Sequence, residues 1–200
     1  VCSSDLANAI LHSMLAETYW NYYQQNRWKF MNRSVTVDFN NDDISTWDLD
    51  KIFQQTVSEY RRSLDMQDQE MKIKSNIFDD ILVKGNSQEA RNFRPTLYDF
   101  LAHRAVDFFM NEEPGITQPA TRYKIDAAWY LNDVDMFLNF ALLKEDTLNM
   151  KYNAIQILQD LIRFHQNDVH PGALIDVNLK RLKFVYGELT ISNKDSLYLN

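Results

Sequence analysis

Glycine and proline are scarce in this sequence, with four of each among 200 residues. That scarcity argues against a turn-rich β-sandwich or barrel and favours long helices. The sequence also lacks a run of about twenty apolar residues, which a membrane-spanning helix requires. The net charge of −7 argues against a sequence-independent nucleic-acid binder, because such proteins gain affinity by neutralising phosphates. These absences indicate a helical protein without a direct membrane span.

Cysteine is limited to Cys2, within the opening segment VCSSDL. Residues 1–6 back-translate to the end of a common sequencing adapter, so we expect them to be non-native and assign Cys2 no chemistry. Attachment of a lipid to Cys2, as in lipoproteins, is the alternative. Without a native cysteine, the sequence gives no indication of the redox compartment.

The segment from about Ser4 to Asn32 has the periodicity of an amphipathic helix. The side chains expected on its apolar face are those of Leu11, Leu15, Tyr19, Tyr22, Tyr23 and Phe30. The polar side chains expected on the opposite face are those of Glu17, Asn21, Gln24 and Gln25. Aromatic and cationic residues alternate here as they do in base-stacking surfaces, but the cations form no row. Core packing is therefore expected, with Trp20 and Trp28 as candidate anchors for a protein-binding groove.

Two later helices have capping signals at their starts. Ser45 and Asp48 have the spacing of a capping box, ahead of a helix that runs to about residue 64. Thr96 is the expected N-cap of a helix that starts at residue 97, and Asp99 occupies its capping-box position.

The helical pattern changes along the chain in a way that indicates two regions. We expect residues 7–145 to form a helical domain with an irregular insertion near 112–140, which contains a short helix at about 133–139. Residues 146–200 are expected to form a helical hairpin whose second helix is apolar around most of its circumference. Such a helix must be covered on two sides, as in a stack of hairpins. We therefore predict an all-α fold with a repeat-like, TPR-like superhelical architecture, truncated at its C-terminus.

The sharpest group of chemically capable residues is Asp99, His103 and Asp107, spaced by four along one helix. A histidine between two carboxylates would have a raised pKa and could act as an acid or join a metal site. However, one helix supplies at most these three ligands, and no HExxH-type partner accompanies them. We favour a polar face that is solvated or that fixes helix packing.

The two histidines near the hairpin turn give no convincing metal pattern. His165 and His170 are five residues apart without a cysteine, and His165 falls within the apolar arc of its helix. A hydrogen-bonded core histidine is therefore expected at position 165. The sequence also contains no GxSxG, glycine-rich phosphate loop or CxxC motif. We predict a protein that is not an enzyme, with no catalytic residue, no cofactor and no metal ligand.

Three segments together resemble a known family: LHSMLAETYWNYYQQNRWKFMNRS, DDISTWDLDKI and RPTLYDFLAHRAVDFF. They are similar to the helical N-terminal region of the large alpha-2-macroglobulin-like proteins of Bacteroidetes, over most of residues 7 to 112. The resemblance implies an exported protein of the periplasm or cell envelope, often lipid-anchored. Full-length members carry macroglobulin β-sandwich domains, and many trap proteases through a thioester in a CxEQ motif.

This chain lacks a CxEQ motif, so the inhibitory residues of the family cannot be transferred to any position here. Tyr98, Phe100, His103 and Arg104 carry the resemblance without an implied catalytic role. The expected function is that of a helical scaffold or protein-interaction module, whose partners are other domains of the same longer chain and a partner protein. An independent adaptor of helical repeats that binds peptides or glycans is the alternative.

Overall fold

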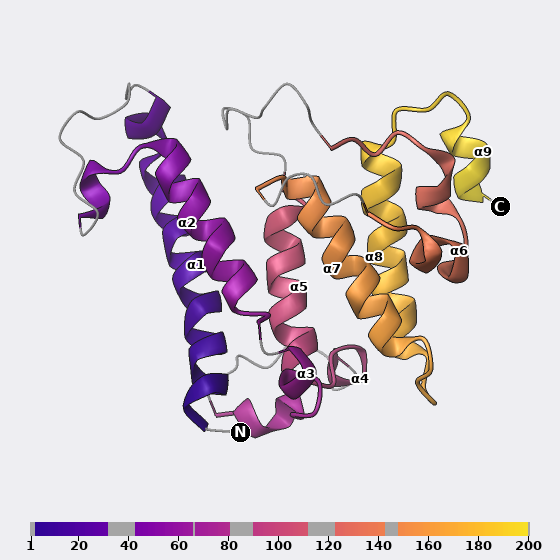
Figure 1. Ribbon diagram of the computed structural model, residues 1–200, viewed down its shortest axis with the longest axis horizontal. Helices are drawn as coiled ribbons and strands as arrows, with labels where there is room; N and C mark the ends of the chain where they lie inside the picture. Colours follow the sequence, from indigo (N-terminus) through magenta and orange to yellow (C-terminus); the bar gives the residue numbers. More distant parts are fainter. Residues whose placement is uncertain are drawn as a thin grey trace. The chain divides into compact units, whose positions relative to one another are not determined.

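The computed structural model of the chain describes residues 3–31, 43–65, 67–80, 90–111, 123–142 and 148–199. These residues form helices and contain no β-strand, which confirms the all-α prediction (Figure 1). The α-helices are α1 (Ser3–Met31), α2 (Leu49–Arg62), α3 (Gln67–Glu70), α4 (Ala90–Phe93), α5 (Leu97–Phe109), α6 (Val134–Asn139), α7 (Met150–His165), α8 (Gly172–Glu188) and α9 (Lys194–Leu199). The 3-10 helices are η1 (Ile44–Thr46), η2 (Ser75–Phe78) and η3 (Ala128–Leu131).

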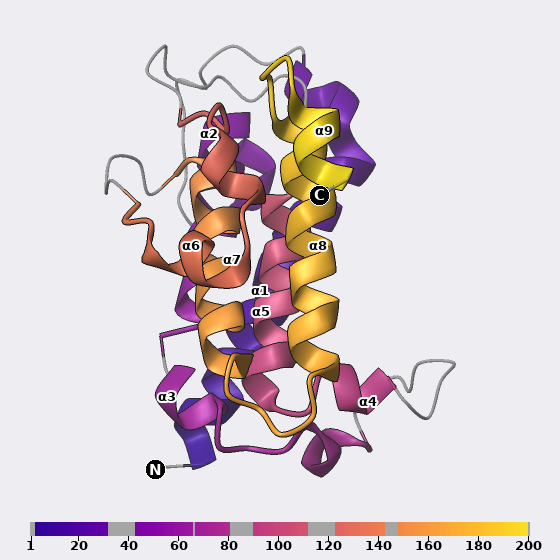
Figure 2. The ribbon, with the colours of Figure 1, turned by 90° about the vertical axis from the view of Figure 1, so that its right-hand side faces the viewer.

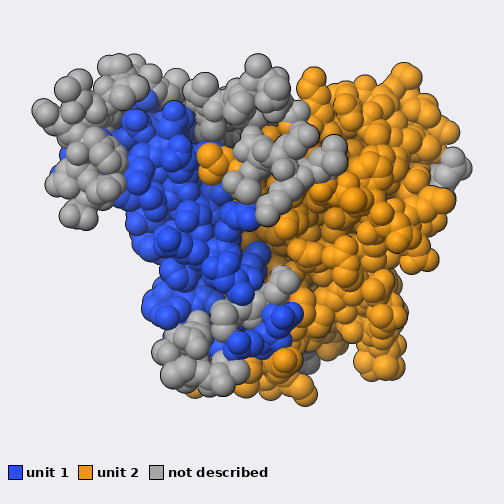
Figure 3. Space-filling model, in the orientation of Figure 1, with its two compact units in different colours: residues 1–70, 112–120 blue, residues 71–111, 121–200 orange. Residues whose placement is uncertain are grey.

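The chain divides into two compact units (Figure 3). Unit 1 comprises residues 1–70 and 112–120, and unit 2 comprises residues 71–111 and 121–200. Residues of the region expected to be one helical domain therefore occur in both units.

In unit 1, helices α1 and α2 pack side by side and run in opposite directions (Figure 1). Tyr23 and Phe30 of α1 are buried together with Trp47 and Ile52 in an apolar core. The rings of Tyr23 and Phe30 lie 5.6 Å apart between centroids, in the range of favourable aromatic pairs. The aromatic half of α1 is thus a packing surface within unit 1.

The N-terminal half of α1 buries a different face from the predicted one. Leu11 and Leu15 are exposed, whereas Ala9, Ser13 and Ala16 are buried. The predicted polar face is confirmed by the exposure of Glu17, Asn21, Gln24 and Gln25. The distance between packed helices depends on the side chains at their contact, so small residues allow a close approach. A projection that weights large apolar side chains misses a face made of small ones.

The start of α2 also corrects a prediction. Ser45 lies within the short helix η1, and the backbone N–H of Ser45 donates to the carboxylate of Asp43 at 2.9 Å. The N-cap of α2 is Asp48, whose Oδ1 accepts a hydrogen bond from the backbone N–H of Lys51 at 2.8 Å. The 3-10 turn separates Ser45 from α2, so the capping box expected between Ser45 and Asp48 is wrong.

In unit 2, α5 packs against α7, and α7 packs against α8 (Figures 1 and 2). The predicted capping box at the start of α5 is confirmed. The Thr96 hydroxyl accepts from the backbone N–H of Asp99 at 3.2 Å, and the Asp99 carboxylate accepts from the backbone N–H of Thr96 at 2.9 Å. Lys151 at the start of α7 pairs with Glu188 at the end of α8, as expected for neighbouring helices of opposite direction.

The predicted short helix within the irregular region is confirmed as α6, whose N-cap Asp133 accepts from the backbone N–H of Met136 at 2.9 Å. Buried side chains from α7 and α8 hold the backbone around α6. The Gln159 amide donates to the carbonyl oxygens of Phe137 and Phe140 at 2.8 and 3.1 Å. Arg181 donates to the carbonyl oxygen of Asn132 at 2.8 Å. The part of the insertion at 112–122 lies outside the described residues.

Helix α8 is apolar on two sides, as predicted, but the described residues cover only part of it. Ala173, Val177 and Val185 are buried, whereas Ile175 and Leu179 are exposed. A second layer over Ile175 and Leu179 would complete the predicted stack, and no described residue supplies it. The repeat-like superhelix therefore stays a prediction.

Candidate functional site

A group of three polar side chains joins the first turn of α5 to the end of α7 and the residues that follow it. His165 Nε2 lies 2.6 Å from Asp99 Oδ1, and His165 Nδ1 lies 2.7 Å from Asp168 Oδ2. The side chains of Asp99 and His165 are 0% and 2% exposed, whereas that of Asp168 is 39% exposed. We call these three residues the Asp99–His165–Asp168 triad. It extends from the buried capping box of α5 to the molecular surface.

The geometry of the triad favours a protonated imidazole. A protonated imidazole can donate from both ring nitrogens, and each nitrogen of His165 faces a carboxylate oxygen, which accepts hydrogen bonds. Burial lowers the pKa of His165, but the hydrogen bond and charge of Asp99, followed by those of Asp168, raise it by more. The net pKa of His165 therefore lies above its ordinary value. Two carboxylates and one imidazolium leave one net negative charge, which reaches solvent at Asp168.

The structure does not bring Asp99, His103 and Asp107 together as one site. Asp99 points its carboxylate to Thr96 and His165. His103 is buried without a hydrogen-bond partner on either ring nitrogen, and Asp107 is exposed and pairs with Lys180 at 2.6 Å. Burial first, and then the positive charges of nearby residues, lower the pKa of His103 to about 2. His103 is thus a neutral core residue at physiological pH.

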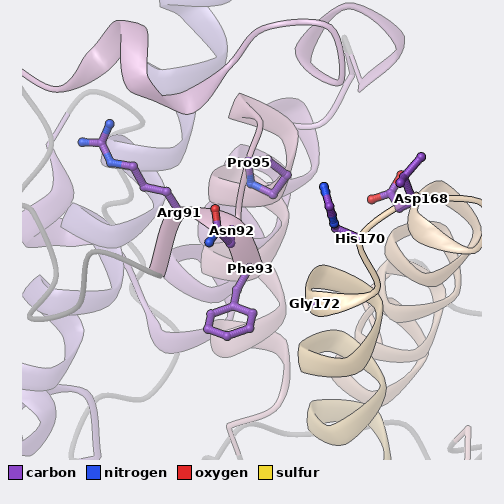
Figure 4. Close-up of a pocket in the computed structure, with 8 residues that line it drawn as sticks. Arg91, Asn92, Phe93, Pro95, Asp168, His170 and Gly172 are labelled. Atoms are coloured by element: carbon purple, nitrogen blue, oxygen red, sulfur yellow. The ribbon is translucent and has the colours of Figure 1, made fainter.

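An open cleft of about 590 Å³ lies beside Asp168. The residues that line it are Arg91, Asn92, Phe93, Pro95, Asp168, Val169, His170 and Gly172. Figure 4 shows that they come from two sides: α4 and the turn after it, and the α7–α8 connection with the start of α8. A methyl group at Gly172 would meet the Phe93 ring at 3.5 Å, an ordinary contact, so Phe93 lies against the first turn of α8. The cleft is built by segments about eighty residues apart in sequence.

Arg91, the arginine among the described residues that line the cleft, is already paired. Arg91 forms an ion pair with Asp79, and Figure 4 shows the Arg91 side chain extending away from Asp168 and His170. The guanidinium therefore does not balance the charge of Asp168. Apolar surface comes from Phe93, Pro95 and the exposed Val169.

Among the described residues that line the cleft there is no serine, threonine, cysteine or lysine, which are common nucleophiles of covalent catalysis. Within the described ranges, no cluster of three or more histidine, cysteine or acidic residues has the geometry of a metal site. In the triad, both ring nitrogens of His165 are engaged by carboxylates. The arrangement can orient Asp168 and present its charge to a ligand.

The two candidate aromatic anchors, Trp20 and Trp28, belong to unit 1. Trp20 is half-buried and packs against Tyr23, with ring centroids 5.2 Å apart. Trp28 is exposed, and the ammonium of Lys29 lies 5.4 Å from its ring centroid. Trp20 is therefore part of the unit 1 core, and Trp28 presents its ring to solvent.

Sequence reasoning placed His165 in the core but did not find its partners. Asp168 follows His165 by three residues, a spacing at which side chains at a helix end can meet, and this was the available signal. Asp99 is 66 residues away from His165, and no local pattern connects them. The cleft residues of α4 carried no motif.

The fold and the cleft define an all-helical protein with a cleft of mixed polar and apolar lining. No protein-family model matches the chain, and comparisons with curated proteins and with solved structures give no match either. Along the described parts of the chain, every helix is too short or too polar to cross a membrane.

Proposed function

We propose that this chain is a non-catalytic helical module that binds a partner polypeptide in the cleft of unit 2. The observation that carries the proposal is the cleft itself. Its volume of about 590 Å³ lies within the range of about 300–1,000 Å³ that ligand sites occupy. It combines apolar walls with a carboxylate that is held by a buried imidazole. Such a surface is suited to recognition.

The resemblance to alpha-2-macroglobulin-like proteins supplies the context of the proposal. In that context the module belongs to an exported protein of the periplasm or cell envelope. It serves as a scaffold or docking element beside other domains of the same longer chain. A protease-inhibitor role belongs to those other domains, since no inhibitory motif occurs in this sequence.

The exposed face of α8 favours a second candidate. Ile175 and Leu179 would be covered if further helical hairpins stacked on α8 in a TPR-like superhelix. The protein would then be an independent helical-repeat adaptor that binds peptides or glycans. The genomic sequence downstream of Asn200 separates the two candidates. Macroglobulin sandwich patterns support the first, and hairpins that run to a stop codon support the second.

Acid–base catalysis by Asp99, His103 and Asp107 has little support in the geometry. The imidazole of His103 is buried, and Asp107 is engaged with Lys180. A reacting group would have no access to His103, so we propose no catalytic role for these residues.

Photo-cross-linking tests the binding function directly. The cross-linking amino acid benzoylphenylalanine replaces Asn92, an exposed residue of the cleft, in the cells that make the protein. The control carries it at Asp135, an exposed residue in the first turn of α6. We expect a polypeptide, identified by mass spectrometry, to cross-link from position 92 and not from position 135. Equal yields from both positions would contradict the proposal.

A further inference from the structure

We infer that the cleft receives a lysine or arginine side chain of the partner polypeptide, with Asp168 as its counter-ion. This inference rests on the proposed binding function and adds the chemistry of the ligand. It follows from the charge, the walls and the rigidity of the cleft.

The charge of the cleft comes from the Asp99–His165–Asp168 triad. Asp99 and His165 neutralise one another in the interior, which leaves the charge of Asp168 uncompensated. Asp168 Oδ2 is held by His165, and the Asp168 side chain is partly exposed, so a ligand can approach this carboxylate. A carboxylate that is oriented before binding loses less side-chain entropy when a cation binds.

Among the described residues that line the cleft, Arg91 is the one arginine or lysine, and Arg94 lies between two lining residues without being one of them. Arg91 and Asp79 pair with one another. The first turn of α8, which starts at the lining residue Gly172, contributes about half a positive charge, less than the full charge of Asp168. The charge of Asp168 therefore favours a cation in the cleft.

The walls of the cleft fit the stem of a basic side chain. Phe93 offers a partly exposed ring, and Pro95 and Val169 add aliphatic surface. Lysine and arginine place their methylene groups against apolar surface and keep the charged end near polar groups. A cation above an aromatic face gains further electrostatic attraction. The cleft volume of about 590 Å³ exceeds the volume of one side chain, so the cleft has room for flanking residues of a polypeptide as well.

Calorimetric titration of the full chain at pH 8 with acetyl-Ala-Ala-Lys-Ala-Ala-amide tests the inference. The comparison peptide carries acetyl-lysine, which keeps the stem and removes the charge. We expect saturable binding of the lysine peptide and affinity at least about fivefold weaker for the acetyl-lysine peptide. Equal affinity for the two peptides, or no saturable binding of either, would overturn the inference. Butylamine serves as a third probe, and affinity equal to that of the lysine peptide would overturn the assignment to a polypeptide.

Two variants connect the binding to this cleft. Asp168→Asn keeps the size of the side chain and its acceptor for His165 while removing the charge, and we expect about a five- to tenfold loss of affinity. Asp135→Asn is the matched control and should bind as the parent does. Phe93→Ala is a second test on a partly exposed residue, with an expected two- to fivefold loss. Unchanged affinity in both Asp168→Asn and Phe93→Ala would place the cation elsewhere and overturn the inference.

The experiments distinguish a failure of this inference from a failure of the proposed binding function. A polypeptide that cross-links at position 92 through a segment without lysine or arginine would leave the binding function standing and overturn the inference about charge. Absence of any specific cross-link at position 92 would instead remove the function on which the inference rests.

Discussion

Asp99 Oδ1 and His165 Nε2 lie 2.6 Å apart in the interior of unit 2, and this contact joins α5 to α7. The other carboxylate oxygen of Asp99 belongs to the capping box with Thr96. The Asp99 side chain thus caps the start of α5 and contacts the buried imidazole of His165, which in turn holds Asp168. Its removal should affect folding and the cleft together.

Replacement of Asp99 by asparagine should lower the free energy of unfolding by about 2–4 kcal/mol. The cost arises because the buried imidazolium of His165 loses its most buried counter-ion. Hydrogen exchange of the amides of α5 and α7 measures the change in unit 2 alone. The matched control, Asp107→Asn, removes an exposed ion pair with Lys180 and should cost less than about 1 kcal/mol. Equal costs for the two variants would contradict the role assigned to Asp99.

The two buried histidines should have opposite effects on the pH dependence of stability. The pKa of His165 is raised on folding, so its contribution is complete below about pH 6.5 and is lost as pH rises through the folded-state pKa. The pKa of His103 falls to about 2 on folding, so stability decreases as pH falls below about 6.5. Imidazole NMR titration should show His165 titrating above pH 6.5 and His103 staying neutral at pH 5.

A His103→Leu variant isolates the second effect. It removes a buried group with two unpartnered nitrogens, so we expect a gain of about 1 kcal/mol at pH 7 and a larger gain at pH 5. Urea unfolding of the variant and of the parent chain at the two pH values measures the gain, and a gain that is the same at pH 5 and pH 7 would show that His103 titrates normally.

Gln159→Ala should destabilise the attachment of α6 by about 1–3 kcal/mol, because the carbonyl oxygens of Phe137 and Phe140 lose their donor. Faster hydrogen exchange in residues 134–139 measures this effect. Gln156→Ala, on the same helix at a half-buried position, serves as the control and should change stability by less than about 0.5 kcal/mol. No difference between the variants would mean that the two carbonyl groups find other donors.

Ala16→Leu tests the buried face of α1. Ala16 is fully buried, so the larger side chain should push α2 away at a cost of about 1–3 kcal/mol. Leu15→Ala, at the neighbouring exposed position, should have little effect on the unfolding of unit 1. If Leu15→Ala destabilised unit 1 more than Ala16→Leu, the buried face of α1 would be the predicted one, which contains Leu11 and Leu15. Thermal unfolding followed by tryptophan fluorescence can follow both variants, because Trp20, Trp28 and Trp47 lie in unit 1 and a Trp129→Phe background removes the signal of unit 2.

Local sequence patterns predicted the structural features that depend only on residues close together in the sequence. The capping box of Thr96 and Asp99 could be predicted because its partners are three residues apart and act on their own helix. The periodicity of α7 and the N-cap of α6 at Asp133 are local in the same sense. The all-α fold follows from the same features, together with the scarcity of glycine and proline.

Tertiary structure alone decided which polar residues meet. Helical projection places Asp99, His103 and Asp107 on one face, but packing against α7 turned Asp99 to His165 and left His103 without a partner. The packing of α1 likewise buries Ala9, Ser13 and Ala16 and leaves larger apolar side chains exposed, because closely packed helices favour small residues at the contact. The cleft beside Asp168 joins α4 to the start of α8. Contacts between distant segments depend on the packing of whole helices, which periodicity within one helix does not specify.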